Sequence, residues 1–138
     1  MNGEVRQERT HWRDQGLSQR HRKWGFHCPA IDLDFLLVEY DTGLTVAIIE
    51  YKNEHAPTQW SSHPSYRAIS RLGTTAGLPV FAVRYASDFS WWKVTALNEK
   101  AKEWAAMTAE LTEDDYIRFL YSVRGREAPP DIFEATEI

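Results

Sequence analysis

Two apolar runs separated by a short turn signal constrain the fold more than any other feature of this sequence. Residues 31–40 and 44–51 are rich in Val, Ile, Leu, Phe and Tyr, which suit a half-buried strand. Asp41-Thr42-Gly43 lies between them. A glycine at the last position of a three-residue loop adopts the left-handed conformation at little cost. The sequence therefore predicts a β-hairpin with its tip at these three residues.

A three-residue loop also predicts the register of the hairpin. The expected cross-strand pairs are Tyr40–Leu44, Leu36–Ile48, Asp34–Glu50 and Asp32–Lys52. Because side chains alternate along a strand, one face is expected to carry Asp32, Asp34, Leu36, Val38, Val46, Ile48, Glu50 and Lys52. Opposed carboxylates, with Cβ atoms about 5 Å apart, repel each other unless a cation or a proton lies between them. The open end of this face is therefore a candidate metal site.

This pattern resembles the PD-(D/E)XK nuclease superfamily. In that family an Asp on one hairpin strand meets a Glu/Asp-x-Lys on the next, and the group binds Mg²⁺ and cleaves phosphodiester bonds. The matching residues here are Asp34 and Glu50-Tyr51-Lys52. The resemblance spans about residues 23–85.

The resemblance departs from the family pattern at the aspartate. Pro29 stands three residues before Asp32, so the literal Pro-Asp pair is absent. Asp32 and Asp34 are therefore both candidates, and the predicted register favours Asp34. Family members often carry a further acid on the first helix, and Glu8 or Glu4 is the candidate for that position.

The periodicity and the resemblance together predict an α/β class (α+β, mixed sheet) with a restriction-endonuclease-like core. That core is a helix, a three-strand antiparallel meander, a second helix and a parallel strand. The expected elements are a helix at 3–15, a strand at 24–30, the hairpin, a helix opened by Ser62 or His63 before Pro64 and ended by Gly77, and a buried strand at 78–85. Further along, the pattern predicts an extra strand at 89–97, a helix at 99–107 capped by Asn98, a helix begun by Thr112 and ended by Gly125, and an acidic irregular tail at 126–138.

The implied activity is Mg²⁺-dependent hydrolysis of DNA phosphodiester bonds, expected as an endonuclease, with Mn²⁺ able to substitute. The implied metal ligands are Asp34, Glu50 and the main-chain carbonyl of Tyr51. Asp32 either binds a second ion or pairs with Lys52. Lys52 has three possible roles: it orients the attacking water, deprotonates it, or stabilises the developing charge. Neighbouring carboxylates keep the lysine protonated, which favours the last of these roles.

The charge distribution allows a nucleic-acid partner although the net charge is −4. Residues 1–28 carry +3 and the remainder carries −7. Basic residues neutralise phosphates, and an aromatic ring stacks on an unpaired base. The candidate nucleic-acid contacts are Arg20, Arg22, Lys23 and Trp24 before the hairpin, and Arg67 and Arg71 on the second helix.

Length and composition predict one soluble domain. The 138 residues suffice for a single core, with residues 1–22 as a basic N-terminal segment. One cysteine allows no internal disulfide. No run approaches the roughly 20 apolar residues of a membrane span, and no signal-peptide region is visible, so we expect a cytoplasmic protein. Analogy with the family is the basis for two further expectations. One is a homodimer, and the other is a biological setting in a phage, a mobile element or a restriction system.

Two other functions fit parts of the pattern. The first is a catalytically inactive nuclease-fold module that binds nucleic acid or a protein. The second takes Asp32-Leu33-Asp34 as the Asp-x-Asp metal motif of sugar-nucleotide transferases, for which the chain is short. The sequence leaves open DNA versus RNA, endo versus exo cleavage, linear versus branched substrates, and one ion versus two.

Overall fold

The structure is a computed structural model. It describes residues 16–17, 19–24, 31, 33–57, 63–107 and 109–136, with the side chains of 105–107 and 134–136 left out. The chain divides into two units, Met1–Asp32 and Leu33–Ile138. In the first unit, residues 19–24 are helical. All the elements named below belong to the second unit, and in the part of the chain that the structure describes no helix is long and apolar enough to cross a membrane.

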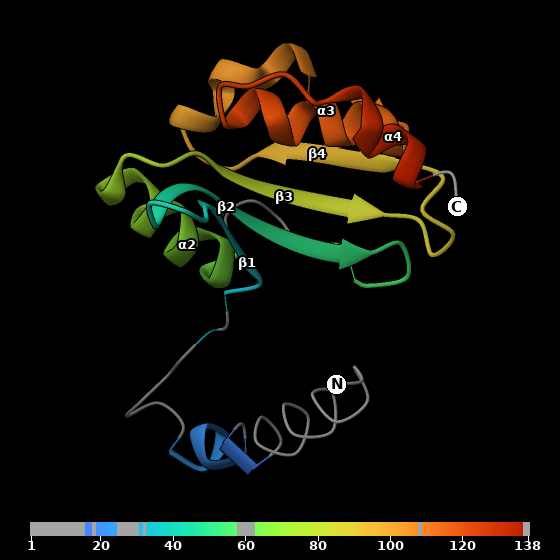
Figure 1. The fold of residues 1–138 in the computed structure, drawn as a ribbon. Coiled ribbons are helices and arrows are strands. Elements are labelled where there is room, and N and C mark those ends of the chain that lie inside the picture. Colours follow the sequence, from blue (N-terminus) through green and yellow to red (C-terminus); the bar gives the residue numbers. More distant parts are fainter. Residues whose placement is uncertain are drawn as a thin grey trace. The chain divides into compact units, whose positions relative to one another are not determined.

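A five-stranded mixed sheet forms the centre of the second unit (Figure 1). Its strands are β1 (Phe35–Glu39), β2 (Leu44–Asn53), β3 (Val80–Tyr85), β4 (Trp92–Ala96) and β5 (Glu110–Leu111), and they lie in that order across the sheet. Strands β2 and β3 are parallel, and the other neighbours are antiparallel. The mixed α/β class expected from the sequence is confirmed, as is the parallel pairing across the intervening helix.

Helices cover both faces of the sheet (Figure 1). They are α2 (Pro64–Ala76), the 3-10 helix η2 (Lys100–Met107), α3 (Glu113–Val123) and α4 (Pro130–Thr136). On the α2 face the buried core comprises Ile48, Tyr66, Ile69 and Val80. On the α3 face it comprises Ala47, Ile49, Phe81, Val83, Val94, Ala101, Tyr116, Phe119 and Val123. Consecutive residues of β2 and β3 therefore pack into different cores, as strand alternation requires.

The hairpin has the predicted register at its open end but not at its tip. Leu36 pairs with Ile48 as expected, whereas Leu44 pairs with Glu39 and not with Tyr40. The turn is thus one residue longer than the predicted loop, and a β-bulge between Leu37 and Val38 on β1 and their partners on β2 restores the register.

The bulge also moves one side chain to the other face. Val46 packs against the core that contains Ala47, so its predicted place on the face of Ile48 is wrong. An extra residue in one strand interrupts the alternation that the prediction assumed.

Several predicted helix ends are confirmed. The His63 side chain caps α2 by accepting a hydrogen bond from the Ser65 amide, and Gly77 ends the helix at φ 74°. Thr112 Oγ1 caps α3 by accepting from the Asp115 amide at 3.2 Å. Asn98 Oδ1 accepts from the Ala101 amide at 3.1 Å, so it caps the predicted segment, which is a 3-10 helix.

Other boundaries differ from the prediction. The strand expected at 89–97 begins only at Trp92, because the chain still turns at Phe89, which has a φ of 62°. The tail is not wholly irregular, since α4 forms within it, and β5 was not predicted. Trp24 is helical, so the prediction of a strand that begins at this residue is wrong. The predicted helix at 3–15 and the rest of the strand to residue 30 lie outside the described residues, as does any third strand of the meander.

A charged pair ties the hairpin to the C-terminal end of α3. Arg124 Nε and Nη2 donate to the two carboxylate oxygens of Glu39 at 2.7 and 3.0 Å, and Arg126 Nη2 lies 3.2 Å from Glu39 Oε1. The two arginines hold the pKa of Glu39 below its ordinary value, the Arg124 hydrogen bonds being the main cause. Two-pronged Arg–carboxylate contacts fix geometry as well as energy, so the outer strand is attached to both β2 and the helix layer.

Gly73 marks the closest approach of α2 to the sheet, and its replacement provides a test of the packing. A Cβ atom there would clash with Val80 Cγ2 and lie 3.0 Å from the Leu78 carbonyl oxygen. Val80 is fully buried and branched at Cβ, so it has little freedom to move. We expect Gly73→Ala to lower the free energy of unfolding by about 1–3 kcal/mol, as overpacking does.

Urea denaturation measures this loss, with Thr75→Ala on the exposed side of α2 as the matched control. The control is expected to stay within about 0.5 kcal/mol of wild type. Equal stability of the Gly73→Ala variant and wild type would contradict the packing described.

Candidate functional site

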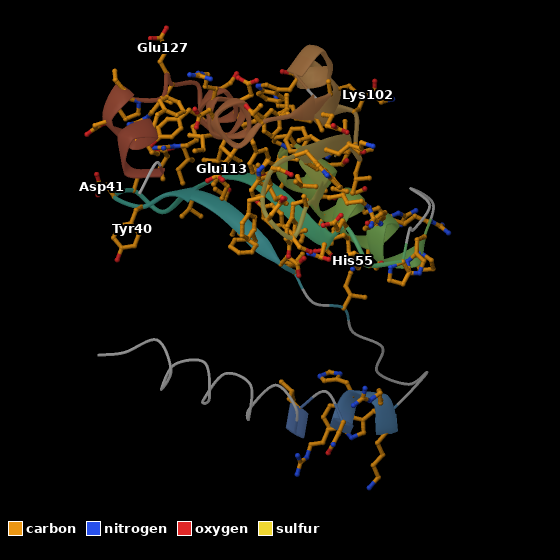
Figure 2. The ribbon with its side chains drawn as sticks, turned by 90° about the vertical axis from the view of Figure 1, so that its right-hand side faces the viewer. Tyr40, Asp41, His55, Lys102, Glu113 and Glu127 are labelled. Carbon is orange, nitrogen blue, oxygen red and sulfur yellow. The ribbon has the colours of Figure 1, made fainter. Side chains whose placement is uncertain are left out.

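The candidate site lies at the open end of the hairpin, where β1 begins and β2 ends. Figure 2 shows Tyr40 and Asp41 at the tip of the hairpin and His55, just past the end of β2, at the opposite end. Asp34 directly precedes β1, and Glu50 and Lys52 belong to the second half of β2. The predicted register therefore brings these three residues to one end of the sheet.

Two main-chain amides, those of Asp34 and Tyr51, hold the Glu50 and Asp34 carboxylates in place. The Asp34 amide donates to Glu50 Oε1 at 3.3 Å, and the Tyr51 amide donates to Asp34 Oδ2 at 3.0 Å. Because β1 starts only at Phe35, the Asp34 carboxylate takes the place of a ladder partner for Tyr51. The Tyr51 carbonyl points to the same side of the strand as its amide. Two carboxylates and one carbonyl therefore gather at the start of β1.

Glu50 is the buried member of the pair, with only 7% of its surface exposed, whereas Asp34 is exposed. Burial raises the pKa of Glu50, and repulsion from the Asp34 carboxylate raises it further; Lys52 acts in the opposite direction. A buried carboxylate facing another carboxylate costs free energy at neutral pH. A proton or a cation relieves that cost.

Lys52 extends from the same face of β2 as Glu50, two residues further along. It is half-buried, and its main chain pairs with Arg84 on β3. Its charge is close enough to Glu50 to lower the pKa of that carboxyl. The predicted trio of two acids and one amine therefore shares the α2 side of the sheet.

Tyr66, in the first turn of α2, faces this group from the helix layer. The residue is 6% exposed, and its pKa is raised first by burial and then by the charges of Glu50 and Asp34, while Arg84 lowers it. The phenol is thus kept neutral and available as a hydrogen-bond donor. The predicted helical face brought Tyr66 to the sheet, but its place beside the carboxylates was not predicted.

Arg84 is a site residue that the sequence analysis missed. Its Nη1 donates to the carbonyl oxygens of Asn53, Glu54 and Ala56 at 2.9–3.1 Å, and its Nη2 donates to the Pro57 carbonyl at 3.3 Å. It therefore holds the segment that follows β2. The signal was present, because Arg84 is the one charged residue in the predicted strand 78–85, which was expected to run parallel to β2.

The other predicted contact residues belong to other segments of the chain. Arg67 and Arg71 are exposed on α2. Arg20, Arg22, Lys23 and Trp24 belong to the helical segment of the first unit, where all four are exposed. The Trp24 ring makes an edge-on contact with His21 at 4.8 Å between centroids. Asp32, Glu4 and Glu8 lie outside the described residues.

Within the described ranges, no group of three or more His, Cys, Asp or Glu residues is close enough to hold a metal ion. Comparisons with protein-family models, with curated proteins and with solved structures find no match to this chain. The residues of the site are therefore the basis for any function assigned to it.

The raised pKa of Glu50 predicts how stability depends on pH. The folded state binds a proton that the unfolded state releases, so this group makes stability fall as pH rises above the ordinary value of 4.5. Below that value both states are protonated and the cost disappears. In EDTA at pH 7.5, Glu50→Gln should therefore raise the free energy of unfolding, by about 0.2–1 kcal/mol, the scale of one opposed like-charge pair.

Urea unfolding from pH 4 to pH 8 measures this difference. The gain of Glu50→Gln over wild type is expected to grow with pH, whereas the exposed control Glu103→Gln should show no such trend. A variant less stable than wild type at every pH would contradict a repulsive carboxylate pair.

Proposed function

We propose that this protein is a metal-dependent nuclease that hydrolyses DNA phosphodiester bonds at Asp34, Glu50 and Lys52. The observation that carries the proposal is the pair of contacts that hold the Asp34 and Glu50 carboxylates together beside Lys52. Folding places like charges in contact there, one of them buried, at a cost that a structural hairpin does not require. A site of this kind is suited to a small, hard cation.

The donor atoms fit Mg²⁺, with Mn²⁺ as a substitute. Asp34, Glu50 and the Tyr51 carbonyl offer only oxygen, the ligand type that Mg²⁺ takes, and Mg²⁺ keeps several waters among its ligands. The ion would be held by these three residues at the start of β1. When bound, it supplies Lewis acidity and neutralises charge on the phosphate. Asp32 remains the candidate for a further ligand.

The protein's own residues have separate tasks in this proposal. The Asp34 amide orients the Glu50 carboxylate and the Tyr51 amide orients the Asp34 carboxylate, so the site is largely preorganised. Lys52, on the same face, stabilises the negative charge that develops on the phosphate oxygens. Tyr66 can donate a hydrogen bond from the α2 side.

The wider context follows from this assignment. We propose that the sheet is a restriction-endonuclease-like core, with DNA as the substrate and Arg67 and Arg71 as exposed contacts for its phosphates. A cytoplasmic location and a homodimer that makes two strand breaks are parts of the same proposal.

One observation favours the alternative, an inactive nuclease-fold module that binds nucleic acid or a protein. The described residues contribute two carboxylates to the site, and each already accepts a main-chain hydrogen bond. A module of this kind would grip its partner without cutting it. Cleavage separates the two functions directly.

The test is cleavage of plasmid and branched DNA with Mg²⁺ and with EDTA. Wild type should cut only with the metal, and Glu50→Gln and Lys52→Met should each be slower by at least about 10²-fold, as for the loss of one preorganised electrostatic group. Thermal unfolding gives a second readout: Mg²⁺ at about 100 times its dissociation constant should stabilise wild type by about 2.7 kcal/mol, but not Glu50→Gln.

The matched controls are Glu103→Gln and Lys102→Met on η2, which remove the same charges from exposed positions. Both should cut like wild type. If wild type binds DNA but never cleaves it, or if both site variants cut as fast as wild type, the nuclease proposal fails.

A further inference from the structure

Side chains on the α2 face of the sheet form three rows across β2, β3 and β4. The first row is apolar and contains Ile48 and Val80, which pair in the parallel ladder. The second contains Glu50, Ala82 and Thr95, and the third contains Lys52, Arg84 and Lys93. In the third row each cation is the direct cross-strand partner of the next.

Three cations in one row carry a cost that the fold only partly offsets. Like charges directly opposite each other destabilise a sheet. Lys93 Nζ lies 3.8 Å from Glu110 Oε1, and both of these side chains are more than half exposed, so the pair is weak. The hydrogen bonds that Arg84 donates among the described residues all go to carbonyl oxygens, which leave its charge in place. The row therefore carries three positive charges, with the Glu50 carboxylate in the adjacent row.

A hollow lies over this row. Its volume is about 100 Å³, and it is lined by Lys52, Tyr66, Ala82, Val83, Arg84, Lys93, Thr95 and Leu97. The short side chains of Ala82 and Thr95 leave the space open between longer neighbours. A single water needs only about 10–15 Å³ measured in this way, so the hollow has room for a polyatomic anion.

We propose that the Lys52–Arg84–Lys93 row is a phosphate-binding site. It holds the phosphate group of the substrate strand that neighbours the phosphate cleaved at Asp34 and Glu50. Three positive groups and two hydroxyls, from Tyr66 and Thr95, match the oxygens of a phosphate. The row lies two residues beyond Glu50 along β2, a separation of about 7 Å for side chains on one face. The inference rests on the proposed function, and it adds two residues, Arg84 and Lys93, that position the strand.

Inorganic phosphate is the first probe, in thermal unfolding at constant ionic strength. Lys93→Gln removes one cation from an exposed position and leaves the carboxylate pair intact. We expect it to weaken the apparent affinity for phosphate by about tenfold, the effect of one charged hydrogen bond. Lys102→Gln is the matched control and should respond like wild type, since a general salting effect acts on every variant alike. Identical responses of Lys93→Gln and wild type would overturn the site.

A labelled DNA single strand in EDTA is the second probe. The slope of the logarithm of DNA affinity against the logarithm of salt concentration is negative. It should become less steep by about 0.7 in Lys93→Gln, the value for one lost phosphate contact, and should not change in Lys102→Gln. An unchanged slope in Lys93→Gln would overturn the assignment of the site to the strand.

The two proposals fail separately. A phosphate response that depends on Lys93, in a protein that does not cleave DNA, supports the anion site and rejects the nuclease. Cleavage that depends on Glu50, without a phosphate response that depends on Lys93, supports the nuclease and rejects this site.

Discussion

The enforced contact between Asp34 and Glu50 is the interaction on which the candidate site depends. Two carboxylates are brought together because β1 and β2 pair in one register, and each accepts a main-chain hydrogen bond that fixes its position. A shift of one residue would send Asp34 to the opposite face of the sheet. The bulge in the hairpin and the contacts of Glu39 with Arg124 and Arg126 therefore support the site from a distance, because they hold the outer strand in place.

The two faces of the sheet have different characters. On the α3 face, aromatic side chains fill the space: the Trp92 and Tyr116 rings stack at 4.6 Å, and the hydroxyls of Tyr51 and Tyr116 lie 2.6 Å apart. On the α2 face the buried core is smaller: it comprises Ile48, Tyr66, Ile69 and Val80, and Ala82 of the next row is only partly buried against it. Charged residues and a hollow lie beyond this core. The larger buried core is thus on the α3 face, and the α2 face has room for a ligand.

Much of the fold could be predicted from local chemistry. The apolar runs, the caps at His63, Asn98 and Thr112, and the left-handed Gly77 each carry a signal in one or a few neighbouring residues. The tip of the hairpin could not be predicted in this way. Contacts across the strands decide between a short loop and a longer turn with a bulge. The predicted pairing of Leu36 with Ile48 nevertheless holds, since the bulge offsets the extra turn residue.

The cations of the hollow were missed for a related reason. Lys52 was found through its spacing from Glu50, whereas Arg84 and Lys93 lie on strands whose partners are distant in sequence. Their alignment follows from the exact register of three strands, which no single segment encodes. Longer-range pairing of this kind is where sequence reasoning is weakest.

The most direct measurement is the anomalous scattering of crystals soaked in Mn²⁺, for wild type and for Asp34→Asn. We expect one peak within coordination distance of the Asp34 and Glu50 carboxylates and the Tyr51 carbonyl, and no peak there in the variant. Wild-type crystals without a peak at this position, and with the two carboxylates still in contact, would contradict the proposed metal site.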